Sequence, residues 1–92
     1  MIVRIATEDQ YRLPDKDAER LNDLDNEAVA AVEAGDEDGF HAAFEEMLEL
    51  VRSDGHKLGE DELEESDVIL PPPDLSFVEA GKDFNGDGLI PD

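Results

Sequence analysis

The sequence predicts an α+β domain, in which an N-terminal β-hairpin packs on an antiparallel two-helix hairpin and an extended, proline-rich C-terminal segment follows. Three observations support this fold class. Apolar residues alternate with a period of two at the start of the chain, as they do in strands. They then recur at spacings of three and four, as they do in amphipathic helices. Finally, three consecutive prolines interrupt the last third of a chain whose 92 residues are enough for one domain.

Residues 1–13 are expected to form the β-hairpin. Apolar side chains alternate from Met1 onward until a polar break at Thr7–Asp9, after which an alternating run resumes. A three-residue loop at this break would place Arg4 opposite Arg12, and like charges in that position destabilise a hairpin. Two interpretations stay open: a salt bridge to the neighbouring helix, or a small basic spot that meets an acidic partner.

Residues 15–53 are expected to form the helical hairpin. The first helix follows Pro14, with Asp15 as its expected N-cap, and Gly35 is expected to end it in the left-handed conformation. Asp36 then begins the second helix, and so short a connection makes the two helices antiparallel. The apolar stripes are Ala18, Leu21, Leu24, Ala28, Val29 and Val32 in the first helix, and Phe40, Phe44, Met47, Leu48 and Val51 in the second.

Residues 54–92 are expected to be largely extended and acidic. Within them, Val68–Leu70 form either a short strand or an extended strip docked on the domain, and Pro71–Pro73 exclude a central strand because proline lacks the backbone donor. Ser76 stands three residues before a glutamate, which is the spacing of a capping box, so we expect a short helix that ends near Gly81.

The charge of the chain restricts its partners. It carries 27 acidic and 7 basic residues, for a formal net charge of −20. Nucleic acids and bare anionic membranes bind proteins mainly through lysine and arginine, so both are unexpected partners. At about 1 M salt the Debye length falls to about 3 Å, and surface carboxylates then repel one another weakly. Because 39% of the residues are hydrophobic and periodically placed, we expect a folded protein from a salt-accumulating, halophilic cytoplasm.

The sequence favours a protein that is not an enzyme. It contains no cysteine, which excludes thiol catalysis and cysteine-ligated metals. No nucleophile, base and orienting group can be placed together, and no cofactor is expected. No apolar run approaches the roughly 20 residues of a membrane span, and no leader is visible at Met1, so we expect a cytoplasmic protein.

One motif suggests an alternative function. Asp83, Asn85 and Asp87 occupy the first three ligand positions of a calcium loop, and Gly88 follows them. The bidentate glutamate of such a loop would lie two residues beyond Asp92, so a turn is the expected structure. A cation-responsive, calcium-binding protein therefore remains the alternative, with these three residues as its weak candidate ligands.

Short motifs along the whole chain carry a family resemblance. They lie at residues 1–5, 10–13, 21–25, 31–36, 66–72 and 88–91. In this order they resemble the PspA-associated protein family PspAA, small proteins encoded beside phage shock protein A. The resemblance implies an accessory protein of the membrane-stress response, whose partner would be phage shock protein A, a coiled-coil protein. Recruitment to the inner face of the membrane would then occur through that partner.

A partner contact is expected on the sheet and on the extended strips. Extended apolar strips add to sheet edges through main-chain hydrogen bonds, although Val68–Leu70 could instead complete the core of this domain. The expected contact residues are Arg4, Tyr11, Arg12, Val68, Leu70, Leu89 and Ile90. The oligomeric state stays open, and a homo-oligomer is one alternative.

Overall fold

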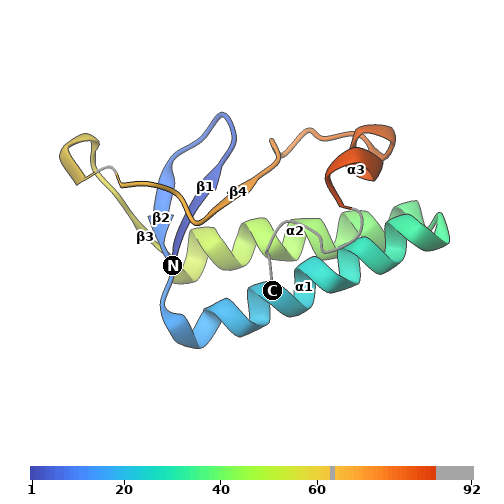
Figure 1. The fold of residues 1–92 in the computed structure, drawn as a ribbon, viewed down its shortest axis with the longest axis horizontal. Helices are drawn as coiled ribbons and strands as arrows, with labels where there is room; N and C mark the ends of the chain where they lie inside the picture. The colour runs from blue at the N-terminus through green and yellow to red at the C-terminus, as the bar shows by residue number, and fades with distance from the viewer. Residues whose placement is uncertain (63, 85–92) are drawn as a thin grey trace.

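Two layers make up the structure: a four-stranded sheet and a pair of long antiparallel helices that cover one of its faces (Figure 1). The computed structural model describes residues 1–62 and 64–84. In chain order the elements are β1 (Ile2–Ile5), β2 (Gln10–Arg12), α1 (Asp15–Ala34), α2 (Glu37–Asp54), β3 (His56–Lys57), a 3-10 turn (Glu60–Glu62), β4 (Val68–Leu70) and α3 (Phe77–Asp83). The predicted α+β class is confirmed.

Strands β1 and β2 form an antiparallel pair in a register that differs from the predicted one. Arg4 pairs with Gln10, so the predicted pairing of Arg4 with Arg12 is wrong. The turn closes one residue earlier than expected, because the N–H of Glu8 donates to the carbonyl of Ile5 at 2.8 Å. Thr7 adopts a φ of 69° within this turn. The two arginines therefore do not face each other across the strands.

Two strands from the C-terminal half extend this pair into the sheet. The strand order is β3-β2-β1-β4, with β3 antiparallel to β2 and β4 parallel to β1. Of the two alternatives for Val68–Leu70, the structure contains the strand, and it lies at the edge of the sheet. Pro71 follows this edge strand directly, in a position where a missing backbone donor costs little. This half of the chain is thus more regular than the expected extended segment.

The helical hairpin begins and ends close to the predicted residues. Pro14 is the N-cap of α1 and offers no side-chain hydrogen bond, so the expected Asp15 cap is wrong by one residue. Gly35 ends α1 with a φ of 73°. The side chain of Asp36 caps α2 by accepting a hydrogen bond from the N–H of Gly39 at 3.0 Å. A Cβ at Gly39 would lie 2.3 Å from a carboxylate oxygen of Asp36, which explains a glycine in this first turn.

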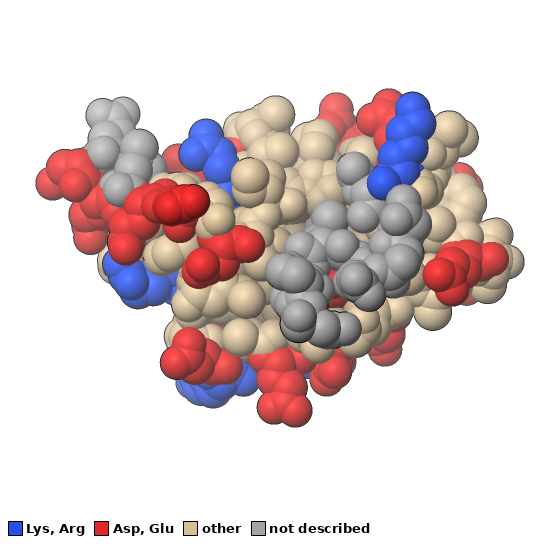
Figure 2. All heavy atoms as spheres, viewed as in Figure 1, with Lys and Arg blue, Asp and Glu red and all other residues tan. Residues whose placement is uncertain are grey.

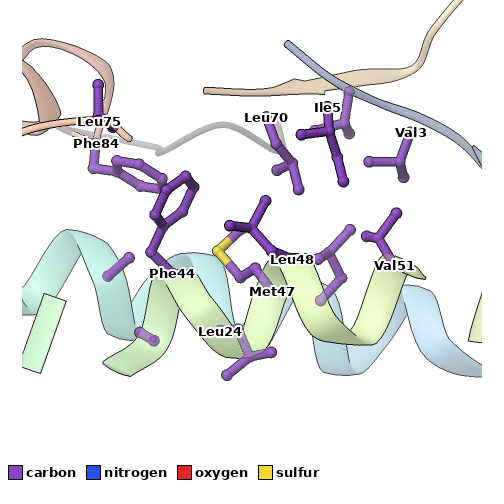
Figure 3. Close-up of a cluster of buried hydrophobic side chains, with 14 of the residues drawn as sticks. Val3, Ile5, Leu24, Phe44, Met47, Leu48, Val51, Leu70, Leu75 and Phe84 are labelled. Carbon is purple, nitrogen blue, oxygen red and sulfur yellow. The ribbon is translucent and has the colours of Figure 1, made fainter. Parts of the chain in front are cut away.

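The hydrophobic core fills the space between the two layers (Figure 3). Val3 and Leu70 point from the sheet toward α2, where Met47 is fully buried. Ser76 caps α3 by accepting from the N–H of Glu79, as the capping-box spacing predicts. Phe84 closes the far end of the core: its ring lies 5.2 Å from that of Phe40 and 5.9 Å from that of Phe44. These contacts attach the end of the described chain to the helical layer.

Candidate interaction surface

The connection from β3 to β4 crosses the outer face of the sheet, which is turned away from α1 and α2, where it covers β2. Gln10 lies beneath this connection and is only 4% exposed. Its Nε2 donates to the carbonyl of Glu64 at 2.6 Å and to Oγ of Ser66 at 2.7 Å. The N–H of Glu64 in turn donates to Oε1 of Gln10 at 3.3 Å. Because the donor and the acceptor of this buried side-chain amide are both hydrogen-bonded, Gln10 holds the connection in place over β2.

The connection leaves Arg4 and Ile69 uncovered within the described residues. These residues are register partners on β1 and β4, so their side chains lie side by side on the outer face. Ile69 is 58% exposed, whereas its neighbours Val68 and Leu70 are buried under the sheet. Arg4 is also exposed, and no ion pair holds it within residues 1–62 and 64–84. An apolar side chain and an uncommitted cation thus form a small surface, which we call the Arg4–Ile69 patch.

Three ion pairs lie around the strands of this sheet. Arg12 pairs with Glu64 beside the covering connection. Arg52, at the end of α2, pairs with Glu8 in the β1–β2 turn, and Nζ of Lys57 lies 3.2 Å from a carboxylate oxygen of Asp9. Four of the seven basic residues in the chain lie at the sheet: Arg4, Arg12, Arg52 and Lys57. The ion pairs therefore neutralise three carboxylates near the sheet, while Glu62, Glu65 and Asp67 on the same connection stay exposed.

Acidic side chains dominate the margins of the molecule (Figure 2). On the face shown in Figure 2, they gather at both ends and along the lower edge, and uncharged atoms fill much of the described surface between them. On the helical layer, an open groove of about 480 Å³ between α1 and α2 is lined by alanines with Glu27 and Glu46 at its rim. Arg20 lies at this layer and is held by Glu46 at 3.0 Å. Arg20 is therefore paired, whereas Arg4 on the sheet has no ion pair in the described chain.

The structure separates the predicted contact residues. Val68 and Leu70 belong to the core of this protein. Tyr11 is half buried and packs against the same core, and Arg12 is engaged by Glu64. Arg4 alone combines exposure with the absence of an ion pair in the described part of the chain. Leu89 and Ile90 lie outside the described residues.

Sequence reasoning missed Ile69, because its exposure depends on which face of the strand meets the helices. Val68 and Leu70 were expected to make the contact because they are apolar. In a strand, however, successive side chains point to opposite faces of the sheet, so the two neighbours of a residue lie on the face opposite to it. Once Val68 and Leu70 pack inward, Ile69 must point outward, and its 58% exposure follows. The sequence left open which of the two faces would meet the helices.

Other functional sites receive no support from the described residues. Residues 1–62 and 64–84 contain no group of three or more histidine and acidic side chains that could hold a metal ion. Asn85 and Asp87 lie outside the described residues, as does the side chain of Asp83, and nothing in the comparisons supports calcium binding. No helix in the described chain is both long and apolar enough to cross a membrane.

The fold and the patch define a small α+β protein with an exposed isoleucine and arginine side by side on its sheet. A scan of protein families matches residues 1–92 to PspAA, described as PspA-Associated protein, and the chain belongs to this family. The predicted family resemblance is thereby confirmed over the whole sequence. Neither the curated proteins nor the solved structures yield a match.

Proposed function

We propose that this protein is a non-enzymatic accessory partner of phage shock protein A (PspA) in the membrane-stress response. The observation that carries the proposal is the match of the whole chain to a family described by its association with PspA. An accessory role is consistent with a structure whose exposed features are a recognition patch and an acidic surface. The protein would act in the cytoplasm and reach the inner face of the membrane through its partner.

The Arg4–Ile69 patch is the proposed contact surface for PspA. Exposed apolar side chains beside an uncommitted arginine are typical of interface centres, where arginine is enriched and acidic residues are depleted. Val68 and Leu70 would contribute by holding Ile69 in place from the core. Tyr11 and Arg12 would lie at the margin, and a role for Leu89 and Ile90 stays a prediction.

Charge reversal at two arginines tests this surface. The native PspA would be captured from purified components in molar KCl by the wild-type chain, by Arg4→Glu and by Arg20→Glu. Both substitutions change the charge by the same amount at an exposed arginine, but Arg20 lies on the helical layer. Loss of one charge-assisted contact predicts about a tenfold weaker capture by Arg4→Glu only. Equal capture by all three chains would exclude the patch, and no capture by the wild type would reject the proposed function.

A further inference from the structure

We propose that β4 receives an extended segment of the partner as an additional strand, and that this segment carries an apolar residue for Ile69 and a carboxylate for Arg4. The proposal rests on the proposed function and specifies how the same surface would recognise PspA. It reverses the roles expected from the sequence, because the Val68–Leu70 strip is already part of this protein's own sheet. The strip therefore offers an edge to a partner strand.

The backbone of Ile69 provides the hydrogen-bonding groups for this strand. The carbonyl of Leu70 accepts from the N–H of Ala6 at 2.9 Å, so the polar backbone groups of Leu70 face β1. Successive residues in a strand point these groups in opposite directions, so the N–H and carbonyl of Ile69 face the outer edge. β4 is the last strand of the sheet, and no described strand pairs with this edge. An edge strand with unpaired groups is a ready template for another chain.

The length of β4 restricts the segment that could dock. The strand has three residues, and three prolines follow it. Prolines cannot donate to a ladder, so the new strand would pair over a few residues around Ile69 only. A short edge bounded by proline also protects proteins from indiscriminate strand pairing. Specificity must then come from side chains beside the strand.

The side chains of the patch select the chemistry of the segment. A residue of the incoming strand on the outer face would lie beside Ile69, about 5 Å away, and would be apolar because it covers an exposed isoleucine. Arg4 lies one strand further, on the same face. Its long side chain can reach a carboxylate of the incoming strand across Ile69. Glu8, Asp9 and Glu64 already have cationic partners, and a carboxylate of Asp67 accepts from the N–H of Ile2 at 2.7 Å, so none of these four groups pairs with Arg4.

Amide hydrogen exchange at Ile69 tests strand addition directly. In the free protein we expect fast exchange at this edge, and on addition of purified PspA in molar KCl we expect at least about tenfold slower exchange. The amide of Val78, an exposed residue in the first turn of α3, serves as the control and should not change. Binding of PspA without protection at Ile69 would overturn strand addition and leave the proposed function intact.

Two substitutions at the same position separate backbone from side-chain recognition. Ile69→Pro removes the outward N–H, which the sheet of this protein does not use, whereas Ile69→Thr keeps it on a β-branched side chain. We expect about tenfold weaker binding of PspA by Ile69→Pro and a smaller loss for Ile69→Thr. Equal binding by both variants would contradict the proposal. If Ile69→Pro does not fold, the hydrogen-exchange measurement on the wild-type chain decides whether a strand is added at β4.

If PspA does not bind, a peptide experiment still tests strand addition at β4. A blocked peptide of alternating valine and glutamate, at millimolar concentration, should protect the Ile69 amide, and an alternating valine and lysine peptide should protect it less. No protection by either peptide, after failure of PspA, would overturn strand addition together with the proposed function. Sedimentation of the protein alone tests whether a second copy of this chain pairs with β4 instead. A dimer that dissociates in the Ile69→Pro variant would show that it does, and would contradict the proposal.

Discussion

The carboxyl group of Asp17, in the first turn of α1, lies against that of Asp54, the last residue of α2. Desolvation, and then the charge and hydrogen bonding of Asp54, raise the pKa of Asp17 above its ordinary value of 3.8, while Lys16 acts in the opposite direction. Oδ2 of Asp17 has no hydrogen-bond partner despite its burial. Two like charges therefore meet where the open ends of the helical hairpin come together.

Asp54→Asn should stabilise the protein at neutral pH. Because the pKa of Asp17 is raised by folding, the ionised pair lowers stability above that pKa, and the penalty is lost as the pH falls through it. The substitution also removes an anion from the C-terminal end of a helix, where it is unfavourable. We expect a higher melting temperature at pH 7, a smaller gain at acidic pH, and a lower pKa of Asp17 in an NMR titration.

Asp23→Asn is the matched control for this effect. It removes one negative charge from an exposed position in the middle of α1. If both substitutions raise the melting temperature equally, the gain comes from net charge alone, and the specific contact between Asp17 and Asp54 would be refuted.

Gln10→Leu should loosen the connection over the outer face of the sheet. The substitution keeps the volume of the side chain but removes three hydrogen bonds and leaves the groups of Glu64 unpaired. We expect a loss of about 1–3 kcal/mol in the free energy of unfolding, because buried polar groups without partners are costly. Denaturant titration in molar KCl measures it, and the Glu64 amide should exchange faster. An unchanged Glu64 amide would contradict the role given to Gln10.

Alanine should have opposite effects at two glycines. Gly35 has a φ of 73°, so Gly35→Ala should cost about 1 kcal/mol. Gly81 lies inside α3 with open space around its missing Cβ, so Gly81→Ala should stabilise by up to about 1 kcal/mol. Thermal melting of both variants in one buffer checks the pair. Destabilisation by Gly81→Ala would show that α3 packs more tightly there than the structure indicates.

Removing salt should loosen the fold. A formal charge of −20 opposes compaction, and screening at about 1 M salt shortens the range of the repulsion to about 3 Å. We expect reduced helical circular dichroism and a lower melting temperature in dilute buffer than in molar KCl. Identical spectra and melting curves in both buffers would contradict this dependence on salt.

The sequence predicted the helical hairpin closely because its signals are local. The stripe of α1, the glycine at residue 35 and the helix start at Asp36 each lie within a few residues of the structure that they determine. The capping box at Ser76 was equally informative. Helix ends and apolar stripes need no knowledge of distant parts of the chain.

The sheet and the patch depended on distant residues, and the prediction was weaker there. A one-residue change in the β1–β2 turn altered the partners of Arg4 and Arg12. The pairing of β1 with β4 joins segments 65 residues apart, as the hydrogen bond from Ile2 to Asp67 shows. No local pattern identifies that neighbour, so the exposure of Ile69 could not be derived before the fold was known.

The parallel pairing of β1 and β4 has a consequence for synthesis. β1 leaves the ribosome first, yet the N–H of Asp67, which donates to the carbonyl of Ile2 at 2.8 Å, comes from the last third of the chain. A nascent chain that ends before Asp67 must carry β1 with one side unpaired, together with an apolar stretch that a chaperone could recognise. Completion of the sheet is thus delayed until Asp67 and β4 have been synthesised.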